Sequence, residues 1–302
     1  MSNGYLDHLT DQIAELSKLQ LFFIVGMPRS GTTWLQRMLN NHKFVCCRGE
    51  SHFVTSFYSK LQKSMKQYHE NNLQNGGVIA HLKQFGGHVE SLDYTSDEIK
   101  LLLYSGMMLM FRKWVSIDSV KAIGEKTPDN LLYMDLLADM FPEAKFIHIV
   151  RDGRDCANSG WFFHRNQLAS GNIMVDSYEE YVNRYMEQWA SSIQISRASQ
   201  EKYSDRIMQC RYESFIRNPN IELSRVFGFL DIETSPEDLV FCVEEESFVK
   251  LTNGRDNGQE DPRSFFRKGI VDDWKSRFSP EIAERAWRVA GSQLAEYGYR
   301  EF

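Results

Sequence analysis

The segment Phe22–Leu39 reads FFIVGMPRSGTTWLQRML and contains the signals that decide the fold. It opens with an apolar run that stops at Gly26, which is typical of a buried parallel strand. A turn containing Pro28 and Gly31 follows, and an amphipathic helix is expected from Thr32. This arrangement points free backbone N–H groups and the positive end of a helix dipole at one place. The segment therefore predicts a cradle for an anion.

The side chains of the turn add donors to this cradle. Ser30, Thr32 and Thr33 contribute hydroxyl groups, and Arg29 offers a planar fork that suits phosphate or sulfate oxygens. Gly31 has no side chain and lets the backbone approach a ligand closely. We therefore expect these residues to bind a phosphorylated or sulfated ligand.

One residue separates this turn from the loop of nucleotide triphosphatases. The spacing from Gly26 to Gly31 matches G-x-x-x-x-G-K-[ST], but Thr32 stands where that motif requires lysine. No acidic magnesium ligand is evident at the end of a strand. The chain thus lacks the lysine and the acidic magnesium ligand that magnesium-dependent ATP hydrolysis usually requires.

The rest of the chain alternates apolar runs with helical patterns. Besides the first run, strands are expected at Lys145–Val150, Val120–Ile123 and Ile207–Arg211. Helices are expected at Thr32–Leu39, Asp97–Val115, Leu131–Met140, Tyr178 to about Ala198, Pro236–Glu246 and Pro280–Tyr297. This alternation predicts an α/β fold with a central parallel sheet flanked by helices.

We expect a single domain over residues 1–302, because 302 residues lie near the upper size of one domain. Residues 1–20 have apolar positions at helical spacing and predict a surface helix. Residues 64–96 and 252–264 are rich in turn-forming residues and predict loops or lids.

The composition excludes several classes of protein. A net charge of -6 argues against broad attraction to nucleic acid or anionic lipid. Five cysteines without a C-x-x-C pair fit neither a disulfide framework nor a zinc site, which favours a reducing, cytoplasmic location. No apolar run is long enough to predict a membrane span.

The motif PRSGTTW resembles the 5'-phosphosulfate loop of sulfotransferases that use 3'-phosphoadenosine 5'-phosphosulfate (PAPS). Further segments follow in the order of that family. In KFIHIVRDGRDCANS, Arg151 ends a strand and Ser159 lies eight residues later, as in the family's 3'-phosphate site. The resemblance implies that Arg151 and Ser159 bind the 3'-phosphate.

The segment FFRKGIVDDWK, residues 265–275, resembles the family's RKGxxGDWK. This implies that Arg267, Lys268 and Gly269 close over the 3'-phosphate. Asp272 occupies the place of the usual glycine, so the turn is expected to differ there.

The resemblance also implies contacts with the nucleoside. Tyr212 matches a cofactor-contacting tyrosine, Ser247 and Phe248 match an adenine-side pair, and Trp34 matches a tryptophan that stacks on adenine. The implied fold is the P-loop-type sulfotransferase fold. PAPS would be the co-substrate and 3'-phosphoadenosine 5'-phosphate (PAP) the product, and no metal would be required.

The catalytic base is less clear from the sequence. Lys126 in GEKTP is similar to the family lysine that faces the sulfuryl group, whereas Pro128 stands where many small-molecule sulfotransferases have a catalytic histidine. Glu50 matches the catalytic glutamate of tyrosylprotein and heparan-type sulfotransferases, and a glutamate can take a hydroxyl proton. His52 is the second candidate. Glu125 is a third, with pairing as its other role.

The acceptor stays open at this point. Aromatic side chains follow Glu50 and Ser159, and either line an acceptor pocket or pack in the core. A small-molecule hydroxyl is the first expectation, although the glutamate arrangement resembles enzymes that act on tyrosines or glycans. A nucleotide-dependent kinase and a non-catalytic PAPS-binding protein are the alternatives. The sequence does not reveal the oligomeric state, or whether oxygen or nitrogen is sulfated.

Overall fold

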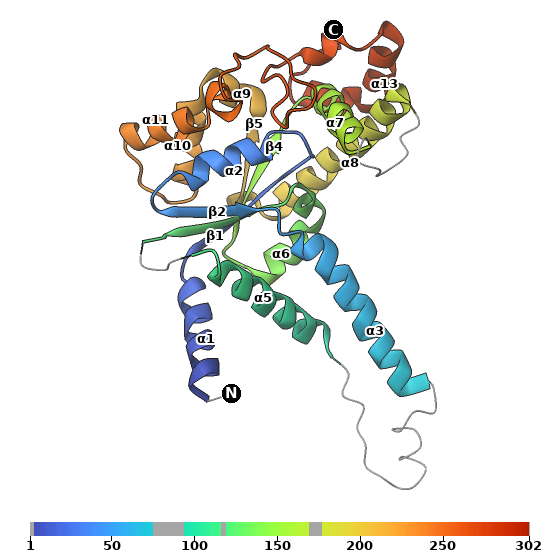
Figure 1. Cartoon of the computed structure of the whole chain (residues 1–302). Helices are drawn as coiled ribbons and strands as arrows, with labels where there is room; N and C mark the ends of the chain where they lie inside the picture. The colour runs from blue at the N-terminus through green and yellow to red at the C-terminus, as the bar shows by residue number, and fades with distance from the viewer. Residues whose placement is uncertain (1–2, 75–93, 116–118, 169–176, 302) are drawn as a thin grey trace.

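The computed structural model describes residues 3–74, 94–115, 119–168 and 177–301. Its centre is a parallel sheet with the strand order β2-β3-β1-β4-β5 (Figure 1). The strands are β1 (Gln20–Gly26), β2 (Val45–Gly49), β3 (Ala122–Lys126), β4 (Lys145–Val150) and β5 (Ile207–Arg211). The α/β class and the parallel sheet predicted from the sequence are confirmed.

Helices surround this sheet (Figure 1). The α-helices are α1 (Asn3–Leu16), α2 (Thr32–Asn40), α3 (Ser59–Gln74), α5 (Ser96–Arg112), α6 (Met134–Met140), α7 (Gly153–Leu168), α8 (Tyr178–Lys202), α9 (Tyr212–Arg217), α10 (Pro219–Phe229), α11 (Pro236–Glu245), α12 (Phe248–Leu251) and α13 (Pro280–Glu296). The remaining helical turns are a π-helix, η1 (Phe53–Tyr58), and the 3-10 helices η2 (Pro128–Tyr133), η3 (Ser204–Arg206) and η4 (Asp273–Ser276).

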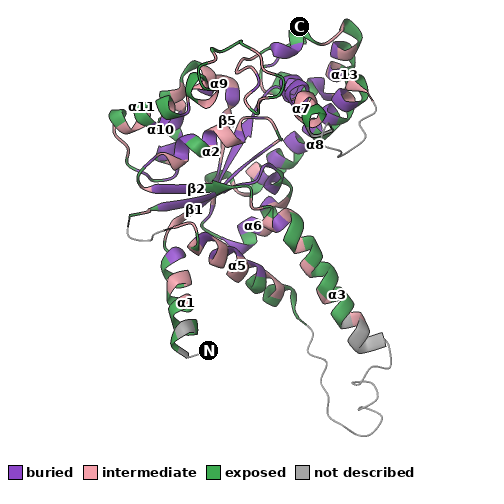
Figure 2. Ribbon diagram, in the orientation of Figure 1, coloured by how far each residue is buried: buried purple, intermediate pink, exposed green. Residues whose placement is uncertain are grey.

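The central strand β1 is buried on both faces, because its side chains alternate between two cores. Phe22 and Ile24 pack with residues of α2 and α10, whereas Phe23 and Val25 pack with residues of α5 and α6. A third core joins α7, α8 and α13. Figure 2 shows the buried strands between helices whose outer faces are exposed.

The sequence-based expectation of a loop over residues 64–96 is wrong in its first part, since residues 64–74 continue α3. Residues 75–93 lie outside the described residues. Every described side chain of α3 is exposed or half-buried, so the helix packs little apolar surface against the rest of the protein (Figure 2). Residues 252–264 form turns without a strand or helix, and their role as a lid stays a prediction.

Two further expectations need adjustment. Strand β3 begins two residues later than predicted and extends to Lys126. Residues 1–20 contain the expected helix, but its last residue, Leu16, is fully buried and the chain enters β1 at Gln20.

The parallel sheet gathers the ends of its strands at one edge. Gly26 lies opposite Ile149, Gly49 lies opposite Lys126, and Val150 lies opposite Arg211. Residues that the sequence marked as functional lie at the end of β3 (Lys126) or just after the ends of the other strands. In parallel sheets this carboxyl edge is where ligands bind.

Candidate active site

The turn after β1 has the backbone shape that the sequence predicted. Gly31 has φ 102°, and a Cβ there would lie 2.6 Å from the ring of Tyr212. A Cβ on Gly26 would lie 2.6 Å from the carbonyl oxygen of Ile149. Only glycine suits these two close approaches.

The helix that follows presents its N-terminus to a cavity. No side chain caps α2 in the described structure, so its first N–H groups lack the usual protein partner. Gly31, Thr32 and Thr33 line the cavity at this point. The N-terminal end of α2 is therefore available to an anion.

The cavity has a volume of about 620 Å³, within the usual range of ligand sites. It gathers all but one of the predicted cofactor-binding residues, namely Arg29, Gly31, Thr32, Thr33, Trp34, Arg151, Ser159, Tyr212, Ser247, Phe248, Arg267, Lys268 and Gly269. The exception is Ser30, which is buried beneath the turn without lining the cavity, and whose Oγ has no partner among the described residues.

Arg29 occupies a junction between three parts of the chain. Its backbone is left-handed, with φ 70°, a conformation that is rare outside glycine and often found at functional sites. Its guanidinium donates to the carbonyl oxygen of Phe265 over 2.7 Å and to Ser159 Oγ over 3.3 Å. Burial, and secondly the nearby charge of Arg151, lower the pKa of Arg29. Arg29 and Arg151 thus lie together at one end of the cavity, which we call the arginine end.

Arg151 is held by the carboxylate of Asp155, 3.6 Å away. It donates to the carbonyl oxygens of Arg29 and Ile270, over 3.3 and 3.1 Å. Its guanidinium lies 4.3 Å from the ring centre of Tyr212. The Nε of Arg151 is buried and has no partner among the described residues. Arg151 is thus held at the cavity by one carboxylate and two carbonyl oxygens.

Arg267 and Lys268 meet at one buried carboxylate, that of Asp273. Lys268 Nζ lies 2.6 Å from Asp273 Oδ1, and Arg267 pairs with the other oxygen. Asn158 also donates to this carboxylate, over 2.8 Å. Desolvation acts to raise the pKa of Asp273, but the hydrogen bonds from Lys268 and Arg267 outweigh it and lower the pKa. The sequence analysis did not single out Asp273, although it lies inside the segment resembling RKGxxGDWK.

Asp272 stands where the resembling family has glycine. Its backbone is left-handed, with φ 60°, and its N–H donates to Asp155 Oδ2 over 2.8 Å. Aspartate tolerates this conformation better than most residues. The backbone of this residue therefore has the conformation that glycine favours.

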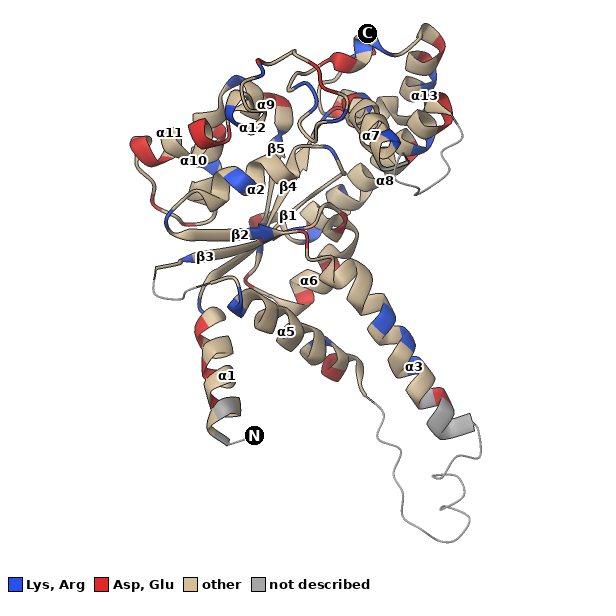
Figure 3. Ribbon diagram, viewed as in Figure 1, with Lys and Arg blue, Asp and Glu red and all other residues tan. Residues whose placement is uncertain are grey.

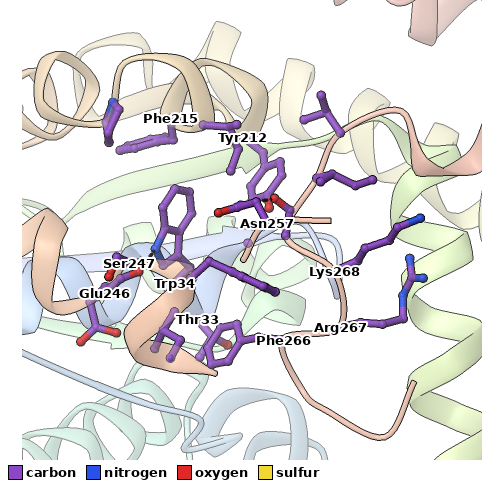
Figure 4. Close-up of a pocket in the computed structure, with 18 of the residues that line it drawn as sticks. Thr33, Trp34, Tyr212, Phe215, Glu246, Ser247, Asn257, Phe266, Arg267 and Lys268 are labelled. Atoms are coloured by element: carbon purple, nitrogen blue, oxygen red, sulfur yellow. Dashed lines mark hydrogen bonds between the residues drawn. The ribbon is translucent and has the colours of Figure 1, made fainter. Parts of the chain in front are cut away.

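The other end of the cavity is lined by aromatic residues. Trp34 Nε1 donates to the carbonyl oxygen of Glu246 over 2.8 Å, and its ring meets Tyr212 edge to face at 5.8 Å. The Glu246 carboxylate accepts from Arg37 and Asn41, which fastens the turn before α12 to α2. Figure 4 shows Trp34 at the opposite end of the cavity from Lys268.

The candidate base lies beside this cavity and not among the residues that line it. Glu50 forms an ion pair with Lys126, and its other oxygen lies 3.3 Å from His52 Nε2. Lys126 Nζ donates to Thr33 Oγ1 over 3.0 Å, so the pair is joined to the anion cradle. The side chain of Lys126 is only 3% exposed, which is incompatible with a solvated surface lysine.

The aromatic residues considered for an acceptor pocket separate into two groups. Phe53 and Phe57 pack together at 5.0 Å, and Phe57 is half exposed. In α7, Phe163 lies 4.9 Å from the Arg29 guanidinium, while Trp161 packs in the third core. Some of these side chains thus border the site and others are core residues.

No three His, Cys, Asp or Glu side chains come together as a metal site in the part of the chain that the structure describes. None of the helices in these ranges is long and apolar enough to cross a membrane. All five cysteines are described, and each is free and buried. Figure 3 shows basic and acidic residues interspersed over the helices.

Comparison with known proteins agrees with this geometry. Protein-tyrosine sulfotransferase A of Caenorhabditis elegans is 26% identical over 70% of this chain and 49% of its own length. Cytosolic sulfotransferase 11 of Arabidopsis thaliana is 23% identical over 91% of this chain and 73% of its own length. A mouse sulfotransferase solved in complex with PAP shares the fold, with a TM-score of 0.52 and 16% identity, over 95% of this chain and 93% of its own.

The tyrosine sulfotransferase relative shows that this chain spans about half the length of some proteins that it matches. The sequence motifs, the carboxyl-edge cavity and these relatives all indicate the same family. A model described as the sulfotransferase family matches residues 22–236, which is more than half of the chain. The chain therefore belongs to the sulfotransferase family.

Proposed function

We propose that this chain transfers the sulfuryl group of PAPS to an acceptor hydroxyl, giving a sulfate ester and PAP. The observation that carries the proposal is the single cavity shared by Arg29, Arg151 and Arg267, which are far apart in the sequence. A nucleotide with phosphates at both its 5' and 3' positions needs two cationic groups near its ribose and an apolar surface for its base. The cavity has arginines at one end and aromatic residues at the other.

The residues present fit such a nucleotide. The N–H groups at the start of α2 and the Arg29 guanidinium would hold the 5'-phosphosulfate. Arg151 and Arg267 both line the cavity, and their guanidinium groups would donate to the 3'-phosphate. Trp34 and Phe248 would lie against the adenine. When bound, PAPS supplies the activated sulfur.

Glu50 is proposed as the base. Its carboxylate would take the acceptor proton as the acceptor oxygen forms its bond to sulfur and the bond from sulfur to the bridging phosphate oxygen breaks. Lys126, which contacts both Glu50 and Thr33, would stabilise the charge on the sulfuryl oxygens. Arg29 would stabilise the departing phosphate. None of these steps uses a metal.

The acceptor is proposed as a hydroxyl on a small molecule. The half-exposed Phe57, in the helical turn η1 that follows Glu50 in the chain, supports an acceptor with an apolar part. A tyrosine side chain is the second candidate, because one relative is named a protein-tyrosine sulfotransferase. The cytoplasmic location expected from the composition stays a prediction, supported by the five free cysteines.

Labelled PAPS incubated with the chain and a panel of phenols, alcohols, amines and tyrosine peptides tests the proposal. Transfer of label to a hydroxyl is expected. Transfer to the amines alone would contradict hydroxyl sulfation. PAP binding without transfer to any acceptor would favour a non-catalytic binding protein, and magnesium-dependent ATP turnover would favour a kinase.

A further inference from the structure

Next to Lys126, the buried carboxylate of Glu125 has no role in the proposed reaction. Glu125 is 0% exposed, and within the described ranges its carboxylate accepts hydrogen bonds only from neutral donors. A buried carboxylate is costly unless hydrogen bonds satisfy it. Such a group is therefore expected to hold something in place.

Two of the hydrogen bonds to Glu125 come from Ser51, the residue after Glu50. Glu125 Oε1 accepts from Ser51 N over 3.0 Å, from Ser51 Oγ over 2.9 Å and from Thr127 Oγ1 over 2.6 Å. Its Oε2 accepts from Asn130 Nδ2 over 2.7 Å. One carboxylate thus ties the segment after β2 to the segment after β3.

The two successive residues of β3 hold Glu50 in different ways. Successive side chains of a strand point to opposite faces. Lys126 contacts the Glu50 carboxylate itself, and Glu125 fixes the backbone of Ser51 next to it. Ser51 Oγ also accepts from Phe53 N over 3.2 Å, which extends the anchored segment past His52.

We propose that Glu125 is a positioning residue that fixes the backbone of Ser51 and thereby aims the Glu50 carboxylate at the acceptor. The inference rests on the proposed function, in which Glu50 is the base. A base displaced by about 1 Å loses about 100-fold in rate, so this support has a measurable effect.

A glutamine at position 125 distinguishes positioning from proton transfer. Asn130 Oδ1 is buried without a partner among the described residues, so a turned Asn130 amide would accept from a glutamine Nε2. The glutamine Oε1 would still accept from Ser51. Glu125→Gln should therefore keep kcat within about threefold of wild type, whereas Glu125→Ala should lower it by about 30-fold.

A matched pair of variants removes one hydrogen-bonding side chain from each oxygen of this carboxylate. Ser51→Ala acts beside Glu50 and Asn130→Ala acts on the far oxygen. Positioning predicts that Ser51→Ala lowers kcat by about tenfold and Asn130→Ala by less than about threefold. Thermal unfolding midpoints and PAP dissociation constants, measured on the same samples, report folding and nucleotide binding separately.

The assay is transfer from labelled PAPS to the best acceptor. Loss of kcat in Glu125→Ala and Ser51→Ala, with PAP affinity unchanged and Glu125→Gln active, supports the inference. Equal losses in Glu125→Gln and Glu125→Ala would assign Glu125 a proton-transfer role and overturn it. If Glu125→Ala does not fold, equal kcat values in the Ser51 and Asn130 variants would overturn it. A wild-type chain that neither binds PAP nor transfers label would instead refute the proposed function.

Discussion

The two charged regions of the site differ in how firmly their side chains are held. Beside the cavity, Glu50 and His52 are 37% and 45% exposed, and only the Lys126 partner is buried. At the arginine end, the side chains of Arg151 and Arg267 are 10% and 6% exposed. The difference fits an exposed region at Glu50 that an acceptor can reach, and a buried region at Arg151 and Arg267 that binds a phosphate in one fixed position.

The partners of the charged groups explain this difference. At the arginine end, each guanidinium is paired with a carboxylate that is at most 2% exposed, Asp155 for Arg151 and Asp273 for Arg267. Such buried pairs fix geometry, because breaking one leaves an uncompensated charge. At the other region, one half-exposed carboxylate is shared by Lys126 and His52.

The largest effect is expected from Glu50→Gln. The amide keeps the shape of the side chain but cannot take a proton, so kcat should fall at least about 100-fold. PAP affinity should change little, because Glu50 does not line the cavity. Steady-state kinetics and calorimetry would measure both, with the exposed Glu284→Gln as control. A near-native kcat would remove Glu50 from the mechanism and bring His52 forward.

The kinetic measurements need a folded protein, and His148, which is buried in β4, should make the fold less stable at acidic pH. Burial lowers the pKa of His148 from 6.5 to about 4. Between these pH values the unfolded chain binds a proton that the folded chain does not, so stability falls on acidification, by about 3 kcal/mol from this group. Denaturant unfolding at several pH values would measure the free energy of unfolding of wild type and of His148→Gln. The variant should lose less of this free energy on acidification, and an equal loss in both proteins would contradict the prediction.

A smaller loss is expected in the anion cradle from Gly31→Ala. At φ 102°, with Tyr212 2.6 Å from the new Cβ, alanine should lower the free energy of unfolding by about 2 kcal/mol. PAP affinity should fall as well, since the turn must shift. Gly228→Ala is the control, because nothing lies within 4 Å of its added Cβ. Equal stability of the two variants would show that the turn is not constrained as described.

The smallest effect is expected from Arg151→Lys. Lysine keeps the charge but loses the planar fork, so PAP affinity should fall about tenfold while AMP affinity should change little. The exposed Arg288→Lys serves as control in the same titrations. Similar losses for PAP and AMP would mean that Arg151 does not contact the 3'-phosphate.

Much of this site could be predicted because short motifs encode local backbone shape. The apolar run before Gly26 and the β-rich run Lys145–Val150 identified two strands, and their following residues lie at the cavity. What the sequence hid was long-range pairing. Asp273 is an ordinary acidic residue until the fold buries it beside Arg267 and Lys268, and the sequence does not show which residues bond to Glu125.

The most direct test of the account is calorimetric titration of the purified chain with PAP and, separately, with AMP. Two cationic regions joined by one cavity predict that PAP binds at least about tenfold more tightly than AMP, because a charge-assisted hydrogen bond is worth about 1.5–3 kcal/mol. Equal affinities for the two nucleotides would contradict a 3'-phosphate site at Arg151 and Arg267, and with it the proposed function.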